Sequence, residues 1–209
     1  MRTTTIFCFL LLTLLSCQSQ NNNPETDRIV GGSCEGCEAT LEYGNRVLNS
    51  VDTIPDFEQN DPKLKLSGTV YQQDGKTPAA GVILYFHQTN RDGIYPPRKG
   101  DTGWARRHGY HHSWLKTNEQ GRYTLFTFRP GAYPGRNIAE HIHLYIKEPG
   151  KTAYYIDDFT FPDDPLNTAK VQKNNPNRGG SGVFQPVLRN GIFEIERDII
   201  LGLNIPDYN

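Results

Sequence analysis

Short segments of β character, separated by turn signals, most limit what this chain of 209 residues can fold into. Six of them lie at residues 64–71, 81–88, 122–128, 141–147, 153–161 and 192–201. Dipeptides typical of turns, such as Asp74-Gly75 and Asn190-Gly191, fall between them. No stretch of this region sustains a helical period. The pattern therefore predicts an all-β fold with a β-sandwich core.

The composition is typical of one globular domain, since 36% of the residues are hydrophobic and the chain has 11 Tyr and 10 Phe. The formal net charge is −1, and no long block of like charges occurs. The sequence thus lacks the basic surface on which electrostatic binding of nucleic acid depends, and we expect no nucleic-acid partner.

The first residues are typical of an export signal. Arg2 precedes an apolar run at residues 6–15, which is too short for a transmembrane helix. The run leads into Ser16-Cys17, which resembles the lipobox of bacterial lipoproteins, where the Cys thiol takes diacylglycerol. We expect a signal peptide at residues 1–16 and an exported chain held on a bacterial membrane, on the periplasmic or cell-surface side, through a lipid on Cys17. The alternative is an ordinary signal peptide cut near Ser16.

Residues 17–63 are predicted to be a polar tether and a short extension that contains Cys34 and Cys37. A disulfide between these two is permitted outside the cytoplasm. Their spacing also suits redox chemistry, but no thioredoxin-like βαβ pattern surrounds them, and a zinc site would need two more ligands. We favour a small structural disulfide loop. Residues 64–209 form the predicted sandwich domain, whose linkers 89–113 and 162–182 are long enough to be active-site loops.

His141 and His143 stand in the predicted strand at residues 141–147. Because side chains alternate between the two faces of a strand, Ile142, Leu144 and Ile146 should point into a core while the two His side chains project together. Two imidazoles in this arrangement can bind one metal ion. The same spacing also occurs on solvated strand faces, which is the alternative interpretation.

Two tyrosines precede this His pair. Tyr95 follows an Asp-Gly turn, and Tyr133 lies in the sequence RPGAYP directly after a predicted strand. In this order Tyr95, Tyr133, His141 and His143 resemble the two-Tyr, two-His iron site of the intradiol ring-cleavage dioxygenases, the family of catechol and protocatechuate 3,4-dioxygenases. The resemblance covers residues 64–201 and implies a β-sandwich core, in agreement with the strand pattern.

The chemistry of these four side chains is consistent with the implied metal. Two phenolates are hard anionic donors, and together with two neutral imidazoles they favour a trivalent ion over zinc or copper(I). Fe(3+) is therefore the expected cofactor. Because a free Tyr has a pKa near 10, cation binding must supply the free energy that keeps both phenolates deprotonated at neutral pH.

The resemblance also implies an activity. It is that of a non-haem Fe(III)-dependent dioxygenase, which cleaves the aromatic ring of a catechol-type substrate between its two hydroxyls using O2. It gives Tyr133 and His143 axial positions and Tyr95 and His141 equatorial ones. Catechol binding then displaces Tyr133 and a hydroxide, which provides the base that takes up the substrate protons.

The sequence departs from the family before the His pair. The family has Arg-Pro-Ala there, whereas residues 135–140 read GRNIAE. Arg136 is the expected substitute for the missing positive charge beside the substrate ring, and the alternative is a surface Arg that pairs with Glu140. Glu140 would also disfavour acidic substrates. The helical dimerisation domain of catechol dioxygenases has no counterpart, which leaves the oligomeric state open.

A second group of His and aromatic residues lies in the first long linker and the residues after it. Its members are His108, His111, His112, Trp104, Tyr110 and Trp114. No acidic or Cys partner accompanies the three His residues, so we favour surface or pocket lining over a second metal site. The aromatic residues either wall the substrate cavity or hold the loop in place.

A non-catalytic function is the competing hypothesis. Residues 64–128, with the sequences SGTVY and DGKTPAAGV, also resemble the transthyretin-like sandwich modules that bacterial surface proteins use for binding or spacing. Such a module gives no reason for Tyr95, Tyr133, His141 and His143 to fall in the family's order. The dioxygenase is therefore the leading hypothesis.

Overall fold

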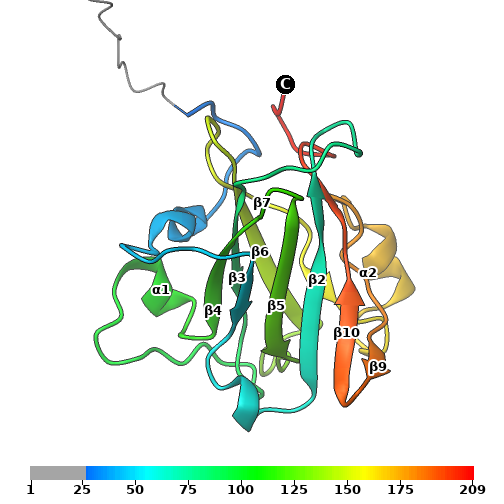
Figure 1. Cartoon of the computed structure of the whole chain (residues 1–209). Helices are drawn as coiled ribbons and strands as arrows, with labels where there is room; N and C mark the ends of the chain where they lie inside the picture. The colour runs from blue at the N-terminus through cyan, green and yellow to red at the C-terminus, as the bar shows by residue number, and fades with distance from the viewer. Residues whose placement is uncertain (1–26) are drawn as a thin grey trace, which may run out of the picture.

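Two β-sheets form the body of the molecule (Figure 1), in a computed structural model that describes residues 27–209. The first sheet has the strand order β1-β5-β2-β10-β9, with β11 beside β2. The second has the order β4-β3-β6-β7, with β8 beside β6. The predicted all-β sandwich is confirmed. The predicted signal peptide and Cys17 lie outside the described residues.

The strands are short, and the helices are single turns or little more. The first sheet consists of β1 (Val51–Thr53), β2 (Lys63–Tyr71), β5 (Arg122–Phe128), β9 (Val187–Arg189), β10 (Ile192–Glu196) and β11 (Ile199–Ile200). The second consists of β3 (Ile83–His87), β4 (His112–Lys116), β6 (His141–Lys147), β7 (Tyr154–Tyr155) and β8 (Phe159–Thr160). The helices are η1 (Cys37–Leu41), η2 (Phe57–Gln59), α1 (Gly103–Arg107) and α2 (Ala169–Lys173), with α1 and α2 on opposite sides of the sandwich in Figure 1. None of the described helices has the length and apolar character needed to cross a bilayer.

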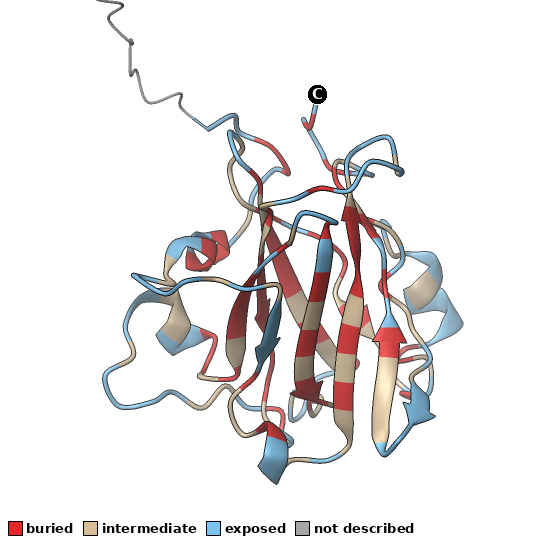
Figure 2. Ribbon diagram, viewed as in Figure 1, coloured by how far each residue is buried: buried red, intermediate tan, exposed pale blue. Residues whose placement is uncertain are grey.

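The core lies between the two sheets and follows the alternation of the strands. Ile142, Leu144 and Ile146 of β6 are fully buried and pack with Leu66 of β2 and Leu125 of β5. Figure 2 shows buried and less buried residues alternating along β2 and β5. Burial of one such aliphatic side chain stabilises the fold by about 1.5–3 kcal/mol. Because alternate residues of β6 are committed to this core, the side chains between them face the outer side of the second sheet.

Two predicted strands are broken in the structure. The segment at residues 153–161 divides into β7 and β8, because the Asp157 carboxylate between them accepts hydrogen bonds from the backbone N–H groups of Asn177 and Arg178, each at 3.0 Å. The segment at residues 192–201 divides at Arg197, whose buried guanidinium donates to the carbonyl of Asp157 at 2.7 Å. Both breaks thus arise from contacts between distant parts of the chain.

The residues before β2 pack against the sandwich. Val30 belongs to the main core cluster and is 1% exposed, and β1 pairs in parallel with β5. Cys34 and Cys37 are joined by a disulfide, with their Cα atoms 5.6 Å apart. The indole N–H of Trp114 donates to the carbonyl of Ala39 at 2.7 Å, so η1 covers the outer face of the second sheet.

Candidate metal centre

The donor atoms of Tyr95, Tyr133, His141 and His143 converge on one point. The two Tyr hydroxyl oxygens are 2.6 Å apart. The Tyr133 oxygen is 3.2 Å from Nε2 of His141 and 3.3 Å from Nε2 of His143, and the two Nε2 atoms are 3.1 Å apart. The structure therefore brings together all four side chains that the sequence identified as a ligand set.

Strand alternation places the two His side chains. His141 and His143 are separated by the fully buried Ile142, so both project from the outer face of the second sheet. His143 lies opposite His87 of β3, and the two rings stack with centroids 4.3 Å apart. The end of β6 is thus the fixed part of the site, and the loops bring the tyrosines to it.

Close backbone packing brings the two Tyr loops together. Gly93 has φ +75°, and a Cβ there would overlap the carbonyl oxygen of Ala132. A Cβ at Gly131 would likewise overlap the carbonyl of Arg91, and the Gly131 N–H donates to the carbonyl of Asn90 at 2.9 Å. Glycine is required where two backbones approach this closely. The turns before Tyr95 and Tyr133 therefore fix how far apart the two hydroxyls can be.

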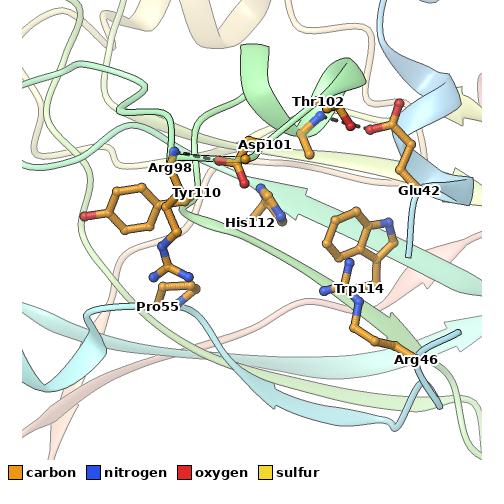
Figure 3. A pocket seen from close by; sticks show the side chains of 11 residues that line it. Glu42, Arg46, Pro55, Arg98, Asp101, Thr102, Tyr110, His112 and Trp114 are labelled. Carbon is orange, nitrogen blue, oxygen red and sulfur yellow. Dashed lines mark hydrogen bonds between the residues drawn. The ribbon is translucent and has the colours of Figure 1, made fainter. Parts of the chain in front are cut away.

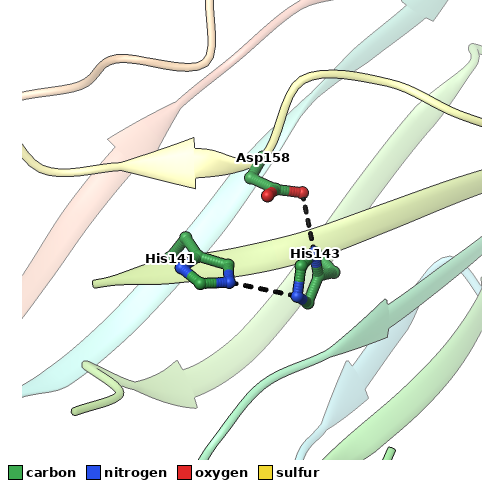
Figure 4. Close-up of side chains that lie close together, drawn as sticks. All are labelled: His141, His143 and Asp158. Carbon is green, nitrogen blue, oxygen red and sulfur yellow. Dashed lines mark hydrogen bonds and ion pairs between the residues drawn. The ribbon is translucent and has the colours of Figure 1, made fainter. Parts of the chain in front are cut away.

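Hydrogen bonds from the other ring nitrogens orient both imidazoles, and Figure 4 shows the one between His143 and Asp158. Nδ1 of His141 is 2.6 Å from the carbonyl oxygen of Ala139, and Nδ1 of His143 is 3.0 Å from a carboxylate oxygen of Asp158. Both partners are acceptors, so each Nδ1 carries the proton and each Nε2 keeps its lone pair. Two lone pairs that face each other at 3.1 Å repel unless a cation lies between them. This arrangement is typical of metal-binding His residues.

The spacing and the donor types fit a hard metal ion. Adjacent ligands that each lie about 2.1 Å from a first-row ion are about 3 Å apart, which matches the four donors here. Burial raises the pKa of both Tyr95 and Tyr133, so without a cation these side chains are neutral phenols. An ion of high charge is therefore needed to hold them as phenolates, and the residues present fit Fe(3+).

Asp158 also belongs to the candidate metal centre, and the sequence reasoning missed it. Burial is the largest influence and acts to raise the pKa of its carboxyl, but the charge and hydrogen bond of His143, together with the charges of His141 and Arg197, keep that pKa below its usual value. Among the described residues, one group of His, Cys, Asp or Glu side chains lies close enough together to hold an ion. It consists of His141, His143 and Asp158. The hydrogen bond to Nδ1 makes Asp158 the group that orients His143. The Asp-Asp pair inside a predicted strand was its only indication in the sequence.

A cavity of about 420 Å³ opens beside this centre. Its lining includes Tyr133, His141, His143 and Asp158, together with residues before β6 and residues on and around α2. The predicted long linker at 162–182 therefore supplies one wall of the cavity. A volume of this size is enough for a small aromatic molecule.

Arg136 and Glu140 do not form the ion pair considered in the sequence analysis. Glu140 instead accepts from Nε of Arg129 at 2.5 Å, and Arg129 also pairs with Asp163. Arg136 is exposed and does not line the cavity, although its charge opposes the effect of burial on the pKa of Tyr133. Its role as a substrate-stabilising charge stays a prediction.

The second group of His residues is dispersed over separate environments. Nδ1 of His108 is 3.1 Å from the Tyr85 hydroxyl, His111 contacts Asp56 at 3.1 Å, and His112 lines a second cavity of about 510 Å³. Figure 3 shows this second cavity, in which Tyr110 and Trp114 also lie. These two aromatic residues therefore line a cavity other than the one at the metal centre.

His87 is a further buried residue that the sequence analysis did not select. It is 3% exposed, and its ring lies between those of His143 and His108, with centroids 4.3 and 3.9 Å away. Neither ring nitrogen has a hydrogen-bond partner. Burial lowers the pKa of His87 well below its usual value, so it is a neutral ring that packs against a metal ligand.

The fold is that of the intradiol ring-cleavage dioxygenases. The dioxygenase domain of a dioxygenase and carbohydrate-binding fusion from the cellulolytic bacterium Streptomyces sp. SirexAA-E superposes with a TM-score of 0.54 at 23% identity, over 77% of this chain and 94% of that one. An intradiol ring-cleavage dioxygenase from Tetranychus urticae superposes with a TM-score of 0.52 at 18% identity, over 84% of this chain and 93% of that one. Chlorocatechol 1,2-dioxygenase from Pseudomonas putida superposes with a TM-score of 0.53 at 17% identity, over 76% of this chain and 67% of that one. No family model and no curated protein sequence matches the chain.

Proposed function

We propose that this protein is a non-haem Fe(III)-dependent dioxygenase that cleaves a catechol ring between its two hydroxyl-bearing carbons with O2. The observation that carries the proposal is the convergence of four donor atoms on the Tyr133 oxygen, which lies 2.6 Å from the Tyr95 oxygen and 3.2 and 3.3 Å from the unprotonated nitrogens of His141 and His143. The solved structures that share the fold are named as dioxygenases, which supports the same class of reaction. A binding or spacer module of the transthyretin-like type would have no use for this arrangement.

The four side chains have distinct roles in this proposal. These four side chains would hold ferric iron, which would supply Lewis-acid chemistry toward the two catechol oxygens and the ring. Tyr133 would be the exchangeable one of the four, and its hydroxyl oxygen would accept a substrate proton. Because burial raises the pKa of Tyr133, its phenol form is favoured once the oxygen is released, which makes it a good proton acceptor.

Arg136 is proposed to stabilise the negative charge that develops on the substrate ring. Its positive charge acts on Tyr133, and it lies three residues along the chain from that ligand. This role requires the exposed Arg136 side chain to reach the substrate from outside the cavity lining, where a guanidinium near the reacting carbon would contribute about 10²-fold in rate.

The chain is further proposed to be exported and anchored to a bacterial membrane through a lipid on Cys17. The support is the sequence alone, in which the apolar run at residues 6–15 leads into Ser16-Cys17. An enzyme anchored in this way would meet its substrate outside the cytoplasm.

Iron binding and ring cleavage test the function together. The purified protein, loaded with one ferric ion, should show the visible charge-transfer band of an iron tyrosinate, consume O2 with catechol and form a ring-opened diacid. Tyr95→Phe and His141→Ala should lose or shift the band and abolish turnover, because each removes a ligand.

Tyr155→Phe is the matched control, since Tyr155 is 38% exposed and lies outside the metal centre. It should keep both the band and the activity. A correctly folded protein that binds no ferric ion, or one that binds it without cleaving any catechol, would refute the proposed function.

A further inference from the structure

The cavity beside the metal centre has uncharged walls. Apart from the metal ligands and Asp158, its lining consists of Asn137, Ile138, Ala139, Thr160, Leu166, Asn167, Val171 and Asn175. No Lys or Arg is among the described residues that line it. A substituent on a bound aromatic ring therefore meets amide, hydroxyl and aliphatic groups, and the one carboxylate in the lining is that of Asp158.

The cations closest to this cavity along the chain are engaged elsewhere or lie outside it. Arg129 pairs with Glu140 at 2.5 Å and with Asp163 at 2.7 Å, and its guanidinium stacks over Phe161 at 4.4 Å. Arg136, next to the lining residue Asn137, and Lys170 and Lys173 of α2 are exposed, and none of the three lines the cavity. A carboxylate on the substrate would thus have no positive partner in the wall, and it would face Asp158.

Two exposed aliphatic side chains line this cavity. Ile138, from the loop before β6, is 42% exposed, and Val171, from α2, is 49% exposed. Leu166 contributes a third aliphatic side chain to the same wall. Exposed apolar side chains that meet at a cavity mark a place where an apolar ligand group is covered. These three residues form what we call the aliphatic rim.

We propose that this cavity selects neutral catechols with an apolar ring substituent and discriminates against catechols that carry a carboxylate. The inference rests on the proposed ring-cleaving function. Each methylene that the aliphatic rim covers should increase kcat/KM about fourfold, because burial of a CH2 group is favourable by that factor. Repulsion by Asp158 should lower kcat/KM for an acidic catechol by about tenfold or more.

A substrate series on the iron-loaded full chain tests the inference. We expect kcat/KM to increase from catechol to 4-methylcatechol to 4-tert-butylcatechol, and to be at least about tenfold lower for protocatechuate than for catechol. Anaerobic titration of the visible band measures binding separately from turnover. The discrimination should be present in binding, because it arises from the cavity wall.

Variants of one rim residue locate the selectivity. Val171→Arg adds the missing cation and should raise the protocatechuate-to-catechol ratio about tenfold, whereas Val171→Ala should reduce the preference for 4-tert-butylcatechol about fivefold. Val187→Ala is the matched control, since Val187 is 50% exposed on β9, outside the cavity. It should change neither ratio.

The outcomes separate the two proposals. Cleavage of catechol with equal or greater kcat/KM for protocatechuate would overturn the substrate class while leaving the proposed function intact. Unchanged ratios in both Val171 variants would overturn the role of the aliphatic rim. Absence of cleavage with all four compounds would refute the ring-cleaving function and the substrate class with it.

Discussion

Removal of the Asp158 carboxylate should weaken the metal centre without removing a ligand. Asp158 lies 3.0 Å from Nδ1 of His143, on the side of the ring away from the Tyr oxygens. Loss of a carboxylate that orients a metal-binding His typically lowers metal affinity 10–100-fold, or about 1.4–2.7 kcal/mol. Asp158→Asn keeps an acceptor oxygen but loses the charge, so we expect about tenfold weaker binding. Asp158→Ala loses both the acceptor oxygen and the charge, so we expect about 100-fold weaker metal binding.

Chelator competition measures this effect directly. The iron-loaded variants are titrated with a ferric chelator of known affinity, and the loss of the visible band reports the fraction of iron removed. Asp163→Asn is the control, because it removes a carboxylate that pairs with Arg129 instead of with a metal ligand. It should bind iron as the natural protein does.

The graded response is the critical result. If Asp158→Asn and Asp158→Ala both retain the affinity and the band of the natural protein, the hydrogen bond to His143 does not orient the ligand. The assignment of the proton to Nδ1 of His143 would then also be wrong. If the two variants lose iron affinity equally, the negative charge of Asp158 determines the affinity and its hydrogen bond to His143 does not.

Four further changes have defined outcomes. Gly93→Ala should destabilise the fold by more than about 3 kcal/mol in denaturant titration, because the new Cβ overlaps the facing loop in addition to straining a backbone with φ +75°. Gly100→Ala meets no atom within 4 Å, so it should cost only the strain of its φ of +95°, about 1–2 kcal/mol. The hydrogen bond from Tyr110 is the largest influence that holds the pKa of Asp56 below its ordinary value of 3.8. The Asp56 carboxylate therefore stabilises the fold above about pH 4, and this contribution is lost as the pH falls through the lowered pKa. Asp56→Asn should destabilise the protein at neutral pH, and unfolding measurements at acid pH should show a smaller difference from the natural protein. Arg136→Ala should lower kcat about 100-fold with an unchanged iron band, and Arg136→Lys should recover part of the rate. Cys17→Ala should move the protein from the membrane to the soluble fraction, and palmitate labelling that persists in this variant would show that the lipid is elsewhere.

Local alternation determined the strands that form the sandwich. The strand at residues 141–147 was predicted with the bounds of β6, and the one at residues 122–128 with those of β5, because apolar and polar residues alternate in both. β1 and β4 were not predicted. The three residues of β1 are all exposed and form a strand through pairing with β5, which is a tertiary contact that no local pattern encodes.

The residues of the candidate metal centre were also predictable from the sequence, because Tyr95, Tyr133, His141 and His143 occur in motifs whose order is distinctive. Their convergence depends on two features that are local as well, namely strand alternation at the His pair and glycine turns before the tyrosines. These features specify the residue types that the site needs, and the fold provides the distances of 2.6–3.3 Å.

The groups that orient and surround the ligands were decided by the tertiary structure alone. Asp158 reaches His143 because the predicted strand at residues 153–161 breaks into β7 and β8, and that break depends on hydrogen bonds from residues about 20 positions further on. The aliphatic rim joins Ile138 and Val171, which are far apart in the sequence and share no periodic pattern. Sequence periodicity reports which face of an element is buried, whereas the contents of a cavity depend on which distant elements meet there.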